Sequence, residues 1–430
     1  MNKPTSHELK TLLEKIVNKT GKLKQSRKNF IVSTLLLYLS LRGRYTFLGL
    51  SRYGEYCEQS YRNHYQKPYD WLSLNWELVK GEVSSERILV FDPSYIPKSG
   101  KSTPHVDKFW SGCLGKAVKG LELGVFGVVD IEKNTAFHLQ SIQTASPTVL
   151  SELDLTLPDY YLDLVLCQKE ELEEVSEYLV VDGYFAKKGF VNGIKNQTGF
   201  TLITKLRVDA NLRYLYNGPY SGKGRPKEFA GKVDLKNIDK RRFKKLEETE
   251  EEIIYECICN VVNLKCNGKI VYVEFKKQGK LTGKYGVYFC EDCNLDGCKV
   301  YKYYKARFQI EFLIRDGKQH TGLTHCQARS VEKLDFHFNA SLTAVNLAKL
   351  LHDPRMKNQM DKSFSMANVK TLYFNELMLN RFFSSFQVDK ELRENKEKIN
   401  EILNLGNIAA YEPDLAGRLS VSLVAFRCSN

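Results

Sequence analysis

Three acidic residues stand where carboxylates could hold divalent metal ions. Asp92 ends the apolar run Arg87-Ile-Leu-Val-Phe-Asp92, and Asp182 ends the run Glu177-Tyr-Leu-Val-Val-Asp182. We expect both runs to be buried strands, and the carboxyl ends of strands face the functional crevice of an open α/β sheet. A carboxylate there is costly unless a cation compensates it, and Mg²⁺ prefers oxygen ligands. Strand-terminal Asp residues also commonly cap the next turn, so this pair alone leaves both roles open.

The third acid, Glu311, lies in a segment with the spacing Y-x2-R-x3-E-x6-K, made by Tyr304, Arg307, Glu311 and Lys318. At about 100° per residue, a continuous helix would place all four on one stripe, although Gly317 could fray its end. Such a stripe offers a metal ligand flanked by cations suited to DNA phosphates. The alternative is a solvated helix face with an Arg–Glu pair at i,i+4.

Alternating strands and helices are expected to position these acids. Apolar runs predict strands at 87–92, 124–130, 136–143, 177–182 and 200–206, with helices at 147–176 and 185–197. This alternation favours a layered α/β domain. Residues 216–300 break the rhythm with a basic, turn-rich loop and strand-like runs near 253–263, 268–276 and 285–290, which predict a β-rich insertion. Helices are expected again from 301 to about 405.

The first 80 residues are predicted to be helical and to bind DNA. Short helices at about 46–53 and 58–66, separated by Gly54, are compatible with a helix-turn-helix. Its second helix would offer Gln59, Arg62, Asn63 and His64 to a groove; an ordinary helical hairpin is the alternative.

The charge of the chain indicates a polyanionic partner. The formal net charge is +13, and residues 1–80 hold 14 Lys and Arg against 6 Asp and Glu. Such an excess attracts nucleic acid. The longest apolar run, from about Phe30 to Leu41, is too short to span a bilayer, so we expect a cytoplasmic protein without a membrane partner. The odd count of 11 cysteines fits reduced thiols better than a disulfide framework.

The chain resembles the DDE transposases of bacterial insertion sequences, in the branch marked by the Y-x2-R-x3-E-x6-K signature. Here the signature reads Tyr304-Lys-Ala-Arg-Phe-Gln-Ile-Glu-Phe-Leu-Ile-Arg-Asp-Gly-Lys318. The resemblance covers roughly 40–350 and includes these flanking segments: Phe109-Trp-Ser-Gly-Cys-Leu-Gly-Lys-Ala-Val-Lys-Gly-Leu-Glu-Leu-Gly124, Val181-Asp-Gly-Tyr184, Gln327-Ala-Arg-Ser330 and Phe336-His-Phe-Asn-Ala-Ser341. Many relatives place Thr two residues after the first Asp, where this chain keeps a hydroxyl as Ser94.

The resemblance implies an RNase H-like catalytic fold whose insertion lies between the second Asp and the Glu. It implies that Asp92, Asp182 and Glu311 bind two Mg²⁺ or Mn²⁺ ions, which activate water to nick a DNA end and then a 3′-hydroxyl for strand transfer. It also implies phosphate contacts for Tyr304, Arg307 and Lys318.

The expected organisation has five parts, described by residue range. A helical DNA-binding region occupies 1–80, the two parts of the catalytic domain occupy 81–215 and 301–350, the β-rich insertion occupies 216–300, and a helical region for dimerisation occupies 351–430.

The expected function is DNA transposition: the protein would bind terminal inverted repeats and target DNA, as a homodimer in the synaptic complex, and would associate with the nucleoid when bound. The alternatives are a metal-dependent DNA nuclease without strand transfer and a DNA-binding protein derived from a transposase.

Several other features have both a functional and a structural interpretation. Lys223, Arg225 and Lys227 resemble a flexible hook for a minor groove, or form a solvated loop. The cysteines between Cys257 and Cys298 could hold a structural zinc ion, although their spacing matches no standard finger, and free thiols are the alternative. Trp110 is expected to pack in the core rather than to stack on a base.

Overall fold

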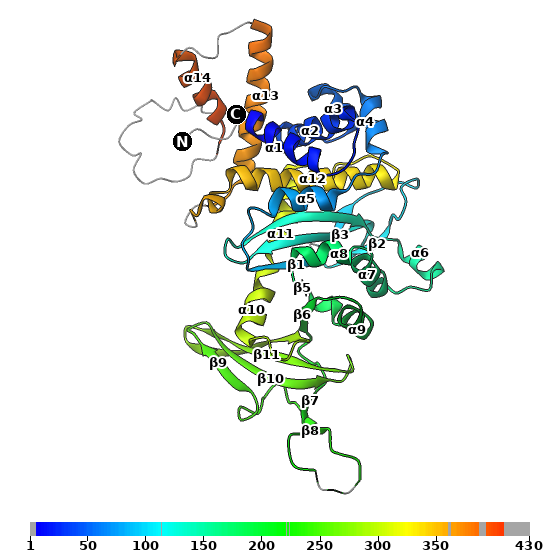
Figure 1. Cartoon of the computed structure of the whole chain (residues 1–430), viewed down its shortest axis with the longest axis vertical. Coiled ribbons are helices and arrows are strands. Elements are labelled where there is room, and N and C mark those ends of the chain that lie inside the picture. Colours follow the sequence, from blue (N-terminus) through cyan, green and yellow to red (C-terminus); the bar gives the residue numbers. More distant parts are fainter. Residues whose placement is uncertain are drawn as a thin grey trace, which may run out of the picture.

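The computed structural model describes residues 6–112, 114–220, 222, 224–359, 363–386 and 393–407. Figure 1 shows an elongated molecule, with the N-terminal and C-terminal helices at one end, a sheet in the middle and further strands at the other end. Within these described ranges, no helix is long and apolar enough to cross a membrane.

The described part of residues 1–80 is helical, as predicted. Its helices are α1 (Ser6–Lys19), α2 (Gln25–Ser40), α3 (Phe47–Tyr53), α4 (Glu58–Tyr65) and α5 (Trp71–Val79). Helix α2 is buried on most sides because it packs against α1, α12 (Val331–His352) and α13 (Met366–Phe386). The apolar run from Phe30 to Leu41 is therefore the internal packing of this helical end.

A mixed sheet forms the middle of the molecule. Its strands lie in the order β4 (Thr135–Gln143), β3 (Lys116–Asp130), β1 (Arg87–Pro97), β5 (Tyr178–Val181) and β6 (Thr201–Leu206). Strand β3 is antiparallel to both β1 and β4, whereas β1, β5 and β6 run parallel. The short strand β2 (Asp107–Ser111) pairs with the start of β3. The α/β class predicted from the sequence is thus confirmed.

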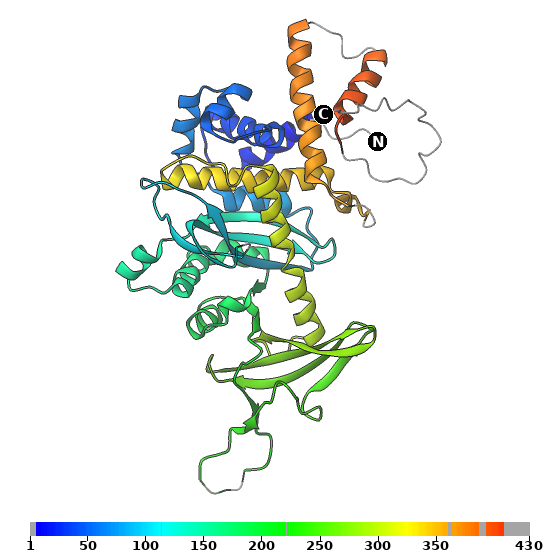
Figure 2. The ribbon, with the colours of Figure 1, turned by 180° about the vertical axis from the view of Figure 1, so that it is seen from behind.

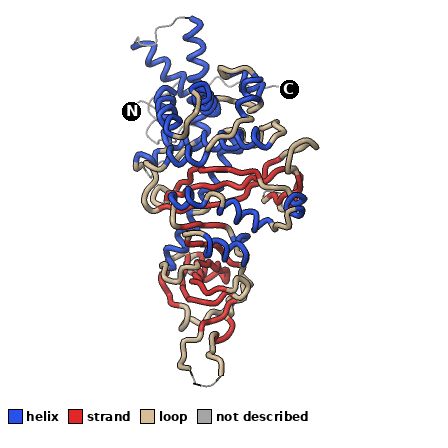
Figure 3. The backbone as a smooth tube through the Cα atoms, turned by 45° about the vertical axis from the view of Figure 1, so that its right-hand side comes forward, coloured by secondary structure: helices blue, strands red, loops and turns tan. Residues whose placement is uncertain are grey.

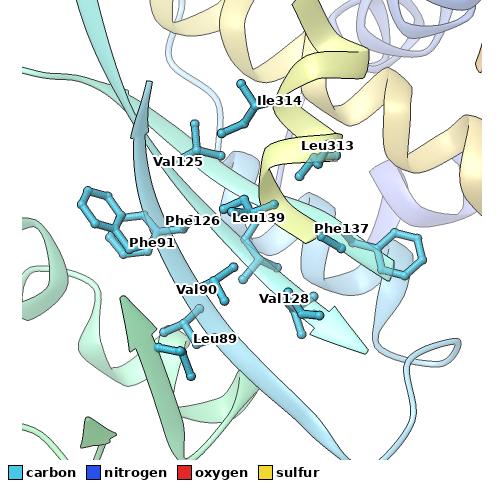
Figure 4. Packing of buried hydrophobic residues seen from close by; sticks show 14 of the residues in the cluster. Leu89, Val90, Phe91, Val125, Phe126, Val128, Phe137, Leu139, Leu313 and Ile314 are labelled. Carbon is cyan, nitrogen blue, oxygen red and sulfur yellow. The ribbon is translucent and has the colours of Figure 1, made fainter. Parts of the chain in front are cut away.

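Helices cover both faces of this sheet, and Phe91 and Ile314 mark the two sides. The Phe91 ring contacts Tyr161 and Phe185 on one face, at centroid distances of 5.3 and 5.7 Å. On the other face, Figure 4 shows Leu313 and Ile314 directed toward the sheet. The helices between the strands are α6 (Pro147–Glu152), α7 (Leu157–Leu166), α8 (Lys169–Val175), the 3₁₀ turn Gly183–Phe185 and α9 (Lys188–Gln197); α10 (Gly297–Ala306) and α11 (Gln309–His320) follow later.

Two buried asparagines join α12 to the outer edge of β4. The Asn346 amide accepts from the His138 backbone nitrogen and donates to its carbonyl, both at 2.7 Å. The Asn339 amide does the same with Ser141, at 2.8 and 2.9 Å. These bonds satisfy backbone groups that an edge strand otherwise leaves open.

The β-rich insertion continues the same sheet. Its strands are β7 (Leu212–Leu215), β8 (Phe229–Lys232), β9 (Lys244–Glu248), β10 (Glu252–Val261), β11 (Cys266–Lys277) and β12 (Lys280–Cys290). Strand β12 pairs antiparallel with β6, and β11, β10, β7 and β8 follow in order. Figure 3 shows these strands as a second tier beyond the central ones. Backbone pairing therefore joins the insertion rigidly to the strand beside β5.

The C-terminal described helices are α13 and α14 (Arg393–Asn404), and a 3₁₀ turn, Pro354–Lys357, precedes them. Met378, Phe382 and Phe386 are exposed along α13. The dimerisation region predicted at 351–430 lies partly outside the described residues, which end at 407. Its role in a dimer stays a prediction.

The continuous helix expected across Tyr304 to Lys318 is wrong. Helix α10 ends at Ala306 and α11 begins at Gln309. Between them, Ile310 N and Glu311 N donate to carbonyls three residues earlier, at 3.1 Å each. These i→i+3 bonds tighten the turn. Gly317, where the helix was expected to fray, is instead buried inside α11. The turn between α10 and α11 can be seen from behind in Figure 2.

Candidate active site

Asp92 and Asp182 lie side by side because their strands are parallel neighbours. Phe91 of β1 is in register with Val181 of β5, so each Asp follows at the same level. Neighbouring strands are about 4.8 Å apart. The sheet therefore brings together two carboxylates that are 90 positions apart in the sequence.

The backbone around Asp182 is fixed by several contacts. Its carboxylate accepts a hydrogen bond from Tyr184 N, and its carbonyl accepts from Thr204 Oγ1 at 2.7 Å. A Cβ at Gly183 would lie 3.0 Å from the Lys205 carbonyl oxygen, so a larger residue would force the turn and β6 apart by a few tenths of an ångström. The turn after β5 thus holds Asp182 at the sheet edge.

Arg307 joins the other two acids. Its Nη1 lies 3.0 Å from Asp92 Oδ1, and its Nη2 lies 3.3 Å from Glu311 Oε1. The tight turn between α10 and α11 points Arg307 inward, where the residue is 8% exposed, while the Glu311 side chain is 42% exposed. Arg307 Nε is buried and has no hydrogen-bond partner among the described residues. The guanidinium therefore lies between two of the predicted metal ligands.

The carboxylate cluster contains more negative than positive formal charge. The pKa of Asp92 is raised to about 7, chiefly by burial and also by the charges of Glu311 and Asp182, while Arg307 acts in the opposite direction. One guanidinium facing three carboxylates leaves a formal excess of two negative charges. This excess and the all-oxygen donor set fit a divalent cation such as Mg²⁺.

The side chains do not form a ready-made metal cage. Within the part of the chain that the structure describes, no group of three or more His, Cys, Asp or Glu residues is arranged to hold a metal ion. Asp92 and Glu311 are instead each paired with the Arg307 guanidinium.

The remaining residues of the signature surround this cluster. Tyr304 packs on Tyr288 with ring centroids 4.8 Å apart, and the Arg307 guanidinium lies 5.6 Å from the Tyr304 ring. Lys318 Nζ donates to Ser94 Oγ at 2.9 Å. Ser94 stands two residues beyond Asp92 on β1, so the retained hydroxyl links the strand to α11.

Arg225 and Lys227 lie far from this cluster. They belong to the loop between β7 and β8, which Figure 1 shows at the end of the molecule opposite the terminal helices. Arg225 pairs with Glu228 at 2.5 Å, and the Lys227 ammonium lies 5.2 Å from the Tyr216 ring. Lys223, the third residue of the predicted hook, lies outside the described residues. The structure therefore does not bring the hook to the carboxylates.

A cavity of about 900 Å³ opens beside Asp92 and Asp182. Trp110 lines it, and at 63% exposure it does not pack in the core as expected, because β2 lies at the margin of the sheet. Tyr184 lines the same cavity and is 45% exposed. Sequence reasoning missed Glu122, a buried acid in the apolar strand β3 that accepts a hydrogen bond from Tyr161. A lone carboxylate within an apolar run was the available signal.

Two histidines and the cysteines were further candidates from the sequence. His337 is buried between Tyr38 Oη and the Gly322 carbonyl, at 2.8 Å each, which is a structural role. His64 stacks on Phe30 with centroids 4.0 Å apart, so it packs inward rather than facing a groove. The described cysteines are all free thiols, and none of them belongs to a metal-binding group within the described ranges.

The part of the chain that carries Asp182 and Glu311 matches a known protein family. Residues 163–347 match the model of a family described as the transposase DDE domain. The match includes Asp182 and the segment from Tyr304 to Lys318, but it begins after Asp92. It supports a transposase-type function and implies an RNase H-like fold and metal-dependent nuclease or transposase activity. No curated protein matches the chain.

Proposed function

We propose that this protein is the DNA transposase of an insertion sequence, which binds terminal inverted repeats and catalyses DNA cleavage and strand transfer. The observation that carries the proposal is the meeting of Asp92, Asp182 and Glu311 at one sheet edge, with a single guanidinium among them. The family match over residues 163–347 supports the reaction class.

The three carboxylates are proposed to hold two Mg²⁺ or Mn²⁺ ions. Bound divalent ions would stabilise the attacking and leaving oxygens of an in-line displacement at phosphorus. Without metal, Arg307 neutralises part of the carboxylate charge. On releasing Asp92 or Glu311, its guanidinium would turn toward DNA phosphate. We propose that Tyr304, whose ring lies 5.6 Å from the Arg307 guanidinium, and Lys318, which contacts Ser94 on β1, also bind DNA phosphate.

The fold agrees with this role. The order β4-β3-β1-β5-β6, with β3 antiparallel and β5 and β6 parallel to β1, is the strand arrangement that we assign to an RNase H-like core. Asp92 lies on β1 and Asp182 directly follows the parallel neighbour β5, and Glu311 comes from a helix on one face. We further propose that the protein acts on chromosomal DNA in the cytoplasm, as a homodimer when two DNA ends are synapsed.

A strand-transfer assay tests the proposal. The DNA flanking the reading frame would supply the candidate ends, which are incubated with a target plasmid and Mg²⁺ or Mn²⁺. Cleavage followed by joining supports a transposase. Cleavage without joining indicates a nuclease, and DNA binding without cleavage indicates a DNA-binding protein derived from a transposase.

A further inference from the structure

A groove of about 1230 Å³ lies beside the terminal helices, away from the cavity next to Asp92 and Asp182. Three segments form its walls: α3 and α4 with the residues before them, the segment 97–103 that follows β1, and the segment 324–333 that leads into α12. We call it the basic groove. Its cationic residues are Arg44, Arg62, Lys98, Lys101, Arg329 and Lys333.

Four of these cations are not ion-paired within the part of the chain that the structure describes. Arg44, Lys101, Arg329 and Lys333 form no salt bridge with any residue in the described ranges. The acid that lines the groove, Glu58, is paired with Arg62, whose Nε lies 3.0 Å from Glu58 Oε1. The unpaired charge is therefore concentrated on one concave surface, where it would attract a polyanion.

Lys98 fixes the wall of the groove. Its Nζ donates to the carbonyls of Cys326 and Ala328, at 2.5 and 3.0 Å. Burial lowers the pKa of Lys98, and the charge of Arg329 lowers it further. Burial likewise lowers the pKa of His325, with Arg44 as the next cause. These cations repel one another, and the hydrogen bonds of Lys98 hold the backbone of the groove wall in position. An anion bound between the cations would reduce their repulsion.

Strand β1 links the basic groove to the carboxylate cluster. Asp92 and Pro97 lie on the same strand, and Ser94, which Lys318 contacts, lies between them. Five residues of extended strand span roughly 17 Å, which corresponds to about five nucleotides at 3.4 Å per phosphate of one strand. One DNA strand could thus run from the cluster into the groove.

We propose that the basic groove binds the phosphate backbone of duplex DNA whose neighbouring segment reaches Asp92, Asp182 and Glu311, an inference that rests on the proposed function. The unpaired cations contact phosphates rather than base edges, so the groove contributes affinity and register without sequence preference. Because α3, α4 and the end of β1 all line it, the groove couples the N-terminal helices to the cluster through the bound DNA.

The test is the salt dependence of binding to a duplex of arbitrary sequence, measured in EDTA so that no cleavage is needed. Each phosphate contact contributes about 0.9 to the slope of log K against log salt concentration. The variant Lys101→Ala with Arg329→Ala should lower that slope by about 1.8 and weaken binding at least tenfold at about 0.1 M salt. Lys101→Arg with Arg329→Lys should keep the wild-type slope.

The matched control is Lys280→Ala with Lys284→Ala, which removes the same charge from exposed positions on β12. This control should leave the slope unchanged, and thermal unfolding should show that both double variants fold. An unchanged slope in the Lys101 and Arg329 variant, or an equal loss in the control, overturns the inference. If the wild type binds through the groove but never cuts DNA, the inference stands and the proposed function fails.

Discussion

The carboxylate cluster and the loop between β7 and β8 are both charged, but the structure holds them in opposite ways. Asp92 lies within β1 and Asp182 directly follows β5, each after three or more buried residues, and Glu311 belongs to a helix packed on the same sheet. Arg225 has an 84% exposed side chain, and its ion pair is with Glu228, three residues away. The cluster is positioned by elements distant in sequence, whereas the loop depends on neighbours along the chain.

This difference matches the chemistry expected of each region. Phosphoryl transfer depends on placing the reacting groups within fractions of an ångström, so its residues need rigid support. Attraction to a DNA backbone needs charge near the surface and tolerates movement. Substitutions should therefore have large effects on catalysis at the cluster and small, salt-dependent effects at the loop.

The largest expected effect is that of Asp182→Asn on DNA cleavage. This change keeps the shape of the side chain but removes a metal-binding charge, so the rate should fall on the order of a thousandfold. Gel analysis of cleaved duplex measures it. The control is Asp163→Asn, an exposed carboxylate on α7 that should leave the rate unchanged. Full-rate cleavage by Asp182→Asn would remove this residue from the site.

The next effect is that of Arg307→Gln on stability without metal. The change leaves Asp92 without its cation, and because the Asp92 side chain is 18% exposed, the cost should be about 2 kcal/mol, below that of a fully buried pair. Mn²⁺ should stabilise this variant more than the wild type, because the ion no longer competes with a guanidinium for Asp92 and Glu311. Thermal unfolding with and without Mn²⁺ tests both points.

The control for that experiment is Arg315→Gln, which removes an exposed cation from α11, the helix that carries Glu311. If Arg307→Gln proved as stable as the wild type without metal, Arg307 would not be the internal counter-ion of the cluster.

A smaller effect is expected from Gly183→Ala. The new Cβ would lie 3.0 Å from the Lys205 carbonyl oxygen, so the turn that carries Asp182 must shift by a few tenths of an ångström. We expect cleavage to fall roughly tenfold with a stability loss of about 1 kcal/mol. The matched control is Gly81→Ala, because no atom lies within 4 Å of its new Cβ. Gly222→Ala is unsuitable because the φ of Gly222 is +76°. Equal rates for both variants would contradict the role given to the turn.

The smallest effect is that of Arg225→Ala with Lys227→Ala. Both side chains lie on an exposed loop, so stability should change by less than about 0.5 kcal/mol. If the loop contacts DNA phosphates, the salt slope of binding should fall by at most about 1.8, with cleavage at saturating DNA unchanged. A loss of cleavage at saturating DNA would show that the loop takes part in catalysis and would remove the contrast between the two regions.

The sequence was informative wherever one local pattern determined the structure. Apolar runs predicted the first part of β1 and all of β5, and the Asp that ends each run lies beside the other because the strands pair in parallel. Strand β1 does not end at Asp92 as expected but continues to Pro97. The i,i+4 spacing of Arg307 and Glu311 indicated an ion pair only as the alternative to a metal site; the pair is present, but Arg307 is buried rather than on a solvated face. These features depend on the period of a strand or a helix, which is visible in a single segment.

The features that were missed depend on distant partners. The break between α10 and α11 turns Arg307 toward Asp92, 215 residues away, and no local pattern reports that contact. The exposure of Trp110 follows from the position of β2 at the margin of the sheet, and the pairing of β12 with β6 follows from the sheet order. Each requires the tertiary arrangement, which residue types in one segment do not specify.

The most direct test of the central claim is calorimetric titration of the folded protein with Mn²⁺. The claim is that Asp92, Asp182 and Glu311 form one divalent-metal site. Wild type and Asp163→Asn should bind Mn²⁺ alike, whereas Asp92→Asn, Asp182→Asn and Glu311→Gln should each lose most of that binding while remaining folded. Undiminished Mn²⁺ binding by all three variants would contradict the account.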